Sequence, residues 1–268
     1  ILAIQNRMGI GDMVIFLPFI EGISKKFNSP VSILVKENSK ASEYLEKNKF
    51  IEKILILERK NDNSHHDGII GSFNLINDLK KYSFDKVFIF NSSLRFRLIC
   101  NIAGIKEIFQ YPLFQKKQQH LIKTAQSFIK KELDMDIDSN PIINLENSLI
   151  ENAKNKYNID TVQINVLLGI GGSGPTKRIP SHKFLSFMKI AIKEYDCNFF
   201  LATGTNEEEQ IILNEILNSE FKQRCVALDK IKIKETLPII KNCTIAVCND
   251  SSFSHLSAAL DIPTIVLL

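Results

Sequence analysis

Short apolar runs alternate with longer amphipathic stretches along the first half of the chain. The runs are rich in Ile, Val and Leu, which predicts buried strands, and the stretches between them carry the spacing of helices. An opening helix ends near residue 27; strands are expected at residues 1–4, 31–35, 53–57, 86–90 and 107–111, and further helices at 41–47, 73–81, 94–103 and 120–133. Such alternation is typical of a parallel sheet covered by helices on both faces.

The second half repeats this alternation. Strands are expected at residues 162–168, 198–203, 226–228, 244–248 and 264–268, with helices at 181–195, 207–217, 234–241 and 252–260. Two successive units of similar length favour two Rossmann-like domains over one extended sheet. Because the last strand has no covering helix after it, we expect the native protein to continue beyond residue 268 and the second domain to be incomplete.

The boundary between the two units is expected in an acidic, breaker-rich stretch. Residues 134–141 read DMDIDSNP, which lacks the sixth-position glycine and twelfth-position glutamate of a calcium loop, so a solvated linker is the better interpretation. The predicted domains are residues 1–145 and 146–268.

Composition narrows the class of protein. Hydrophobic residues make up 44% of the 268 positions and charged residues 24%, with 34 Lys and Arg against 30 Asp and Glu. This small positive excess does not indicate nucleic-acid binding, although it suits work near phosphates or an anionic membrane surface. Five cysteines without a C-x-x-C pair indicate reduced thiols. Without a transmembrane-length run or a signal-peptide layout, a cytoplasmic location is expected.

The turn at residues 6–12 follows the first strand and carries Gly9, Gly11 and Asp12. Glycines let the backbone approach a ligand, and N–H groups at a helix start attract anions, so the turn could hold a phosphorylated ligand. Asp12 has two interpretations. It could cap the helix, as Asp often does, or it could be a general base that faces a ligand.

A glycine-rich loop follows the strand at 162–168. Residues 169–174 read GIGGSG, with Gly172 and Ser173 inside the run and Lys177 and Arg178 beyond it. The spacing fits a dinucleotide fingerprint, but the next strand ends without the acid that would hold a ribose. The loop is still suited to phosphate; a flexible surface loop is the alternative.

A third polar cluster follows the strand at 244–248. Asp250, Ser251, Ser252 and His255 stand where open α/β sheets bind ligands. Helix capping explains the acid and the serines, whereas His255 lies one turn into an apolar helix, as a ligand-facing or a core histidine. Spacing supports neither an activated serine nor a cysteine–histidine dyad. His65 and His66, far upstream, are interpreted as part of a solvated loop, since no acid or cysteine cluster supports a metal site there.

Together these motifs resemble glycosyltransferase family 9, the heptosyltransferases of lipopolysaccharide assembly and their relatives. The resemblance rests on residues 9–12 followed by Pro18, on the KRIP segment at 177–180, on Gly204 followed by Glu207, and on residues 250–264. It spans nearly the whole chain in the correct order.

The resemblance implies an α/β protein with the GT-B fold, in which two Rossmann-like domains with parallel sheets face each other across a cleft. It implies an inverting transfer of heptose or a similar sugar from a nucleotide-diphosphate donor, most often an ADP-sugar, to a lipopolysaccharide-core or other cell-surface glycan acceptor. The acceptor would be lipid-linked or an oligosaccharide, with peripheral contact at the inner membrane surface. The donor is a co-substrate, and no metal or other cofactor is implied.

The family's residue roles transfer onto this chain one by one. Asp12 would be the base, Gly9 and Gly11 would approach the donor diphosphate, and Lys177 would pair with its phosphates. Glu207 would bind the ribose, and the remaining donor-pocket residues would be Gly172, Ser173, Asp250, Ser251, Ser252 and His255.

The chain departs from the family pattern at several of these motifs. Ser252 and Asp261 replace glycines, Phe253 stands near a common proline, and Ile179 replaces an aromatic residue. An NAD(P)-dependent Rossmann oxidoreductase and a non-catalytic nucleotide-sugar-binding protein are the rival hypotheses.

Overall fold

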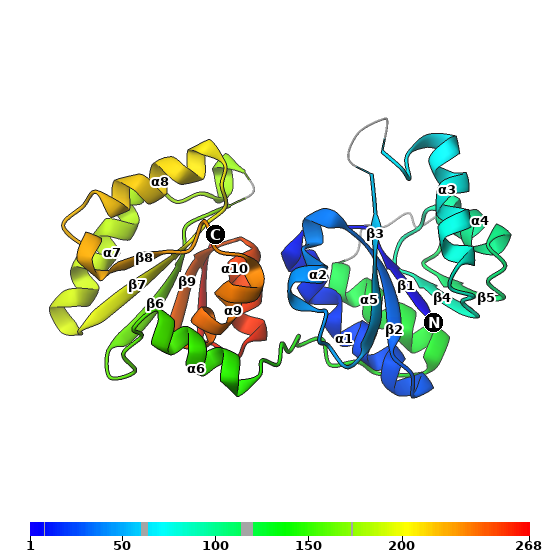
Figure 1. Cartoon of the computed structure of the whole chain (residues 1–268), viewed down its shortest axis with the longest axis horizontal. Helices are drawn as coiled ribbons and strands as arrows, with labels where there is room; N and C mark the ends of the chain where they lie inside the picture. Colours follow the sequence, from blue (N-terminus) through cyan, green and yellow to red (C-terminus); the bar gives the residue numbers. More distant parts are fainter. Residues whose placement is uncertain (8, 60–63, 114–119, 173) are drawn as a thin grey trace. The chain divides into compact units, whose positions relative to one another are not determined.

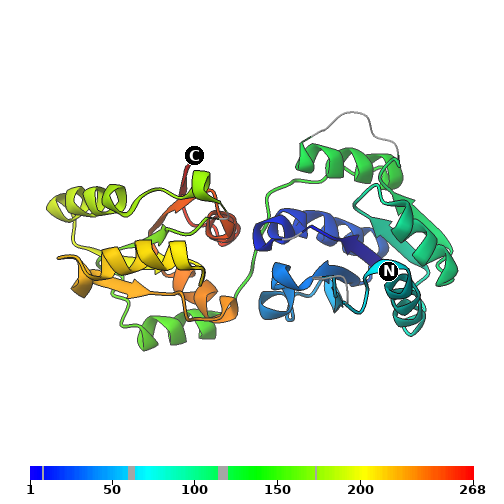
Figure 2. The ribbon, with the colours of Figure 1, turned by 90° about the horizontal axis from the view of Figure 1, so that it is seen from above.

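The computed structural model describes residues 1–7, 9–59, 64–113, 120–172 and 174–268. They form two compact units, Ile1–Pro141 and Ile142–Leu268. Each unit has its own parallel sheet with helices against it (Figures 1 and 2). The predicted α/β class and the two Rossmann-like sheets are confirmed.

The first unit is a five-stranded sheet in the order β3-β2-β1-β4-β5, with every pair parallel. Its strands are β1 (Leu2–Gln5), β2 (Val31–Lys36), β3 (Ile51–Leu57), β4 (Lys86–Ile89) and β5 (Glu107–Gln110). Its helices are α1 (Ile10–Phe27), α2 (Ala41–Tyr44), α3 (Gly68–Lys80), α4 (Leu94–Ile102) and α5 (Leu121–Leu133), with a 3-10 turn η1 (Glu37–Ser39).

Burial explains why these short runs become strands. Leu2, Ala3 and Ile4 of β1 have no exposed surface, as expected for a central parallel strand covered on both faces. Helices α3 and α4 pack against each other on one face, where their apolar sides meet the inner side chains of the sheet. On the other face α1 and α5 pack together, and Phe16, Phe90 and Phe128 join them through ring contacts of 5.1 and 5.5 Å.

The second unit is a five-stranded parallel sheet in the order β10-β9-β6-β7-β8. Its strands are β6 (Ile164–Gly169), β7 (Cys197–Ala202), β8 (Cys225–Ala227), β9 (Ile245–Asn249) and β10 (Thr264–Leu267). Its helices are α6 (Asn147–Lys156), α7 (Ser181–Glu194), α8 (Glu207–Leu217), α9 (Ile233–Lys241) and α10 (Ser252–Ala259), with 3-10 turns η2 (Pro175–Lys177) and η3 (Lys222–Arg224). Helices α7 and α8 pack together, as do α6, α9 and α10 in series.

The two sheets share one topology, in which the first strand is central and the chain then fills one side before the other. In the first unit β1 lies between β2 and β4, and in the second β6 lies between β7 and β9. Ligands of open α/β sheets bind outside the carboxyl ends of the strands at this change of direction. The loops after β1 and β4, and those after β6 and β9, therefore mark the place to look for a site in each unit.

Three helices differ from the sequence predictions. Helix α2 ends at Tyr44, three residues before its predicted end. Helix α6 was not predicted, because its sequence, NSLIENAKNK, buries only Ala153 and so lacks an apolar periodicity. Helix α3 begins at Gly68, five residues before the predicted start, since its first turn carries the exposed Ile69 and Ile70 and no inward-facing pattern. Among the described residues, none of the helices combines the length and hydrophobicity that a bilayer span requires.

Candidate functional site

The loop after β1 is fixed by a buried glutamine. Gln5, only 2% exposed at the end of the strand, accepts a hydrogen bond from the Arg7 N–H at 2.5 Å and donates one to the Asp12 carbonyl at 3.4 Å. A buried side chain that satisfies two backbone groups of the turn restricts its conformations. The turn is therefore held against the carboxyl end of the central strand.

Asp12 is the third residue of α1, and the N-cap position belongs to Gly9, whose backbone is extended (φ −150°). The Asp12 side chain is 31% exposed and lies 3.8 Å from the Arg7 guanidinium. It leans over the helix start, because a Cβ added at Gly9 would stand 3.3 Å from the Asp12 Oδ2. Glycine at position 9 thus leaves room for the Asp12 carboxylate at the start of α1.

Polar side chains also gather after β4 and β5, where the sequence indicated no motif. Gln110 donates to the carbonyls of Asn91 and Ser93 at 3.1 and 2.9 Å. Within the described part of the chain, three buried polar atoms here lack a hydrogen-bond partner: Asn91 Nδ2, Gln110 Oε1 and Tyr111 Oη. Burial raises the pKa of Tyr111, which keeps its hydroxyl neutral. The position of Asn91 and Tyr111 just after strands was the one signal that could have found them.

In the second unit, β6 and β9 approach each other closely at their carboxyl ends. A Cβ at Gly169 would stand 2.6 Å from the Cys248 sulfur, so only glycine fits there. Asn249, which is fully buried, donates to the Ile170 carbonyl at 2.9 Å. These contacts join the glycine-rich loop to the loop that carries Asp250.

Glu209 is a site residue that the sequence reasoning missed. Its carboxylate is 6% exposed and accepts a hydrogen bond from the Gly172 N–H at 2.7 Å. Added Cβ atoms at Gly171 and Gly204 would stand 2.9 and 2.4 Å from its two oxygens, so glycines surround the carboxylate. Asn206 caps α8 by accepting from the Glu209 N–H at 2.9 Å, which sets the side chain in this position. The signal was the clustering of three glycines in two separate loops.

Lys177 and Asp250 bridge the loops after β6 and β9. The Lys177 ammonium lies 2.5 Å from the Asp250 Oδ2, and both side chains are partly exposed, at 44% and 36%. Gly172 lies beneath the lysine backbone, because a Cβ there would stand 2.6 Å from the Lys177 carbonyl oxygen. A cation, a glycine backbone and an acid therefore converge at the change of direction in this sheet.

Helix α10 carries the other predicted residues of this cluster. Ser251 is its N-cap but makes no capping hydrogen bond, and among the described residues its buried Oγ has no partner. Asp250 pairs with Lys177, so capping accounts for neither residue. Ser252 and His255 are half-buried in the first turn of the helix.

Glu207 does not join this group. Glu207 is exposed at the first position of α8, and the carboxylate that contacts the loop is that of Glu209 two residues later. Ser173 lies outside the described residues. The loop also runs through η2 before α7 begins at Ser181, so it lacks the tight strand-to-helix turn of a dinucleotide fingerprint.

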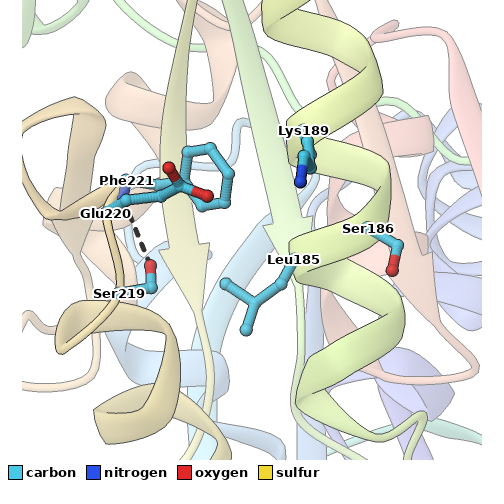
Figure 3. A pocket seen from close by; sticks show the side chains of 6 residues that line it. All are labelled: Leu185, Ser186, Lys189, Ser219, Glu220 and Phe221. Atoms are coloured by element: carbon cyan, nitrogen blue, oxygen red, sulfur yellow. Dashed lines mark hydrogen bonds between the residues drawn. The ribbon is translucent and has the colours of Figure 1, made fainter.

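A cavity of about 300 Å³ lies elsewhere in the second unit. Figure 3 shows its lining, which comprises Leu185, Ser186 and Lys189 of α7 and the segment at residues 219–221, with Leu185 pointing toward that segment. Helix α8 starts at the carboxyl end of β7, so the segment that follows it lies toward the amino ends of the strands. The cavity is therefore separate from the Lys177 site.

One group of described side chains has the spacing of metal ligands: His65, His66 and Asp78, whose ligand atoms lie within 4.8 Å of one another. His66 is only 5% exposed, so the prediction of a solvated loop was wrong for this residue. Its Nδ1 accepts from the Glu58 N–H at 3.0 Å, which places the ring proton on Nε2, 3.0 Å from the Asp78 Oδ2.

Asp78 is further engaged by the Lys81 ammonium at 2.6 Å. This hydrogen bond, with those from His66 and His65, lowers the pKa of Asp78 to about 2. A metal ion at His66 Nε2 would have to replace the ring proton that Nε2 donates to the Asp78 carboxylate. The group is accordingly a hydrogen-bonded network that fixes the start of α3.

Two Rossmann-like units in one chain, each with a parallel five-stranded sheet, are typical of the GT-B-like fold class. Residues 73–268 match the family model described as glycosyltransferase family 9 (heptosyltransferase). The chain belongs to this family. A lipopolysaccharide heptosyltransferase 1 from Campylobacter coli is 22% identical to it over 295 residues, which cover 99% of this chain and 83% of that protein.

Solved structures share the fold. Escherichia coli ADP-heptose lipopolysaccharide heptosyltransferase II matches with a TM-score of 0.74 at 17% identity, covering 99% of this chain and 83% of that one. E. coli heptosyltransferase WaaC with ADP matches with a TM-score of 0.71 at 14% identity, covering 99% and 86%.

Proposed function

We propose that this chain is a glycosyltransferase that moves heptose or a similar sugar from a nucleotide-diphosphate donor, an ADP-sugar above all. The acceptor would be a lipopolysaccharide core or another cell-surface glycan. The observation that carries the proposal is the convergence of Lys177, Gly172 and Asp250 at the carboxyl ends of β6 and β9, within the region of the family match. The relatives' names, a lipopolysaccharide heptosyltransferase and a heptosyltransferase with ADP, support the substrate classes.

On the donor side, the second unit would bind the nucleotide diphosphate. Lys177 and the loop N–H groups neutralise phosphate oxygens, and Glu209 keeps the loop in shape through Gly172. Asp250, Ser251, Ser252 and His255 line the donor pocket in this proposal, and the orphaned Ser251 hydroxyl is suited to a ligand oxygen. Glu207 and Ser173 stay predicted donor ligands.

On the acceptor side, Asp12 would be the base, with Gly9 and Gly11 leaving its turn open to the donor diphosphate. The carboxylate takes the proton of an acceptor hydroxyl as the hydroxyl oxygen attacks the anomeric carbon. The bond from that carbon to the diphosphate breaks, and its electron pair stays on the phosphate oxygen. A single displacement inverts the anomeric centre. Asn91, Gln110 and Tyr111 offer neutral polar groups for an acceptor sugar.

The chain's own groups would supply both the base and the charge neutralisation, so the proposed transfer needs no metal. Turnover that survives excess EDTA would agree with this part of the proposal. Turnover that is lost with EDTA and restored by a divalent cation would refute it.

The test of the base compares sugar transfer by the wild type and Asp12→Ala. We expect turnover to fall at least about a hundredfold, the scale of a lost general base, with little change in thermal stability. Glu21→Ala is the control, since Glu21 is another carboxylate of α1, paired with Lys25 at 2.7 Å. Equal turnover in Asp12→Ala and the wild type would remove Asp12 from the mechanism, and the absence of any thermal shift with nucleotide sugars would overturn the donor class.

A further inference from the structure

Helices α3 and α4 expose an unusual amount of apolar surface for neighbouring elements. The exposed fractions are 80% for Ile69, 77% for Ile70 and 59% for Phe73 on α3. On α4 they are 53% for Leu94, 53% for Leu98 and 54% for Ile102. We call these six residues the apolar patch. Single exposed apolar residues are ordinary, whereas a group on two packed helices marks an interaction surface.

The six residues belong to one continuous surface. The two helices pack side by side (Figures 1 and 2), and Arg95 of α4 donates to the Ser72 hydroxyl of α3 at 2.9 Å, which identifies the seam. With about 100° per residue, Ile69 lies about 60° from Ser72, and Ile102 lies about 20° from Arg95. On each helix, therefore, at least one residue of the apolar patch lies close to the line along which α3 and α4 meet.

Exposed cations accompany the apolar patch. Residues 68–106 contain six Lys or Arg and two Asp, a net charge of +4, which equals the net charge of the entire chain. Four of these cations are exposed on or beside the two helices, namely Lys80, Lys81, Arg97 and Lys106, and Lys81 is paired with Asp78. Lys86 is paired with Glu107, just beyond this range, so among the described residues the unpaired excess of positive charge lies at the exposed cations of the two helices.

We infer that the apolar patch docks on the surface of an anionic phospholipid bilayer. Ile, Leu and Phe side chains insert at the boundary between headgroups and acyl chains, and surrounding Lys and Arg attract anionic lipid. A second copy of this chain fits less well, because an isologous contact would set one positive surface against another. The inference rests on the proposed function in one respect: an acceptor carried on lipid would be presented at such a surface.

The placement of the apolar patch agrees with that role. A helix that follows a parallel strand starts at the strand's carboxyl end, so Ile69, Ile70 and Leu94, in the first turns of α3 and α4, lie toward the sheet edge that also carries Asp12. Docking there would bring the acceptor side of the first unit to the lipid surface.

The experiment measures co-sedimentation of the purified chain with vesicles of phosphatidylcholine alone and of phosphatidylcholine with about 30% phosphatidylglycerol. The apolar variant is Ile69→Ser/Phe73→Ser/Leu98→Ser, and the charge variant is Lys80→Gln/Arg97→Gln/Lys106→Gln. The control, Ile190→Ser/Ile211→Ser, removes two exposed apolar side chains of α7 and α8, at 66% and 52% exposure. All the substituted side chains are exposed, and circular dichroism and melting curves verify that each variant folds.

We expect the wild type to bind the anionic vesicles and to bind them less at high salt. The apolar variant should lose about a hundredfold in partition coefficient, the charge variant about tenfold or more, and the control less than twofold. The inference is overturned if the wild type does not bind the anionic vesicles, or if the apolar variant binds them as well as the wild type does.

A concentration-dependent dimer in light scattering that the apolar variant abolishes would also overturn the inference, in favour of a second copy. The vesicle assay contains neither donor nor acceptor. If the chain does not bind vesicles but nucleotide sugars still stabilise it, the membrane inference fails and the proposed function stands. If the chain binds vesicles but no nucleotide sugar stabilises it, the proposed function fails and the docking of the apolar patch stands.

Discussion

Replacing Glu209 by Ala tests whether the glycine-rich loop is held in place from beneath. The carboxylate is 6% exposed and accepts the Gly172 N–H at 2.7 Å. A hydrogen bond to a charged group contributes about 1.5–3 kcal/mol, and its loss leaves a buried N–H to find another partner. We expect the free energy of unfolding of the second unit to fall by about 2–3 kcal/mol, which lowers its melting temperature by roughly 5–10 °C.

The same substitution should weaken binding of a nucleotide sugar, measured by calorimetry, by about tenfold, because the phosphate loop loses its preorganised shape. Glu207→Ala is the matched control for stability, because its exposed side chain lies on the same helical turn. Glu209→Gln keeps an oxygen for Gly172 and should restore most of the stability. A Glu209→Ala variant with the melting temperature and nucleotide-sugar affinity of the wild type would refute the reasoning. A loss of nucleotide-sugar affinity in Glu207→Ala alone would assign donor binding to Glu207 instead.

Three further substitutions separate the remaining contacts. Lys177→Met should cost less than about 1 kcal/mol of stability, since its partner Asp250 is a partly exposed group, but should weaken donor binding at least about tenfold in calorimetry; unchanged affinity would contradict the phosphate role. Gly172→Ala should reduce both melting temperature and donor affinity, because its Cβ would stand 2.6 Å from the Lys177 carbonyl oxygen; unaltered melting would show that the loop relaxes freely. The depressed pKa of Asp78, about 2, set first by the hydrogen bond from Lys81, implies a stabilisation present above about pH 4 and lost as the pH falls toward 2. The free energy of unfolding of Asp78→Asn, measured in urea, should therefore be lower than that of the wild type at pH 6 and equal to it near pH 2. A difference between the two proteins that does not change with pH would be the contrary result.

Much of the fold was predictable because parallel strands are buried on both faces. A run such as Leu2 to Ile4 has no exposed surface, and that burial is written directly in the sequence as continuous apolar residues. Helix α6 could not be found in the same way, because a helix that buries only Ala153 has no apolar stripe. The early turn of α3 escaped for the opposite reason: its isoleucines point outward, against the usual pattern.

The site was predictable where chemistry follows a strand directly. Lys177 and Asp250 were found from their positions after β6 and β9, and they meet at 2.5 Å. Glu209 was not found, since a glutamate within a run of three looks solvated, and its burial depends on two loops that meet only in three dimensions. His66 was misjudged similarly, because Asp78, its partner, lies twelve residues away.

The pairing of Lys177 with Asp250 has a consequence for donor selection. With the ammonium already 2.5 Å from a carboxylate, a donor phosphate that engages Lys177 would compete with an internal anion for it. A ligand with a single negative charge gains little from such an exchange, whereas a diphosphate offers more charge than the carboxylate it replaces. In the proposed function the resident acid would therefore act as a threshold that a ligand has to exceed in negative charge in order to bind Lys177.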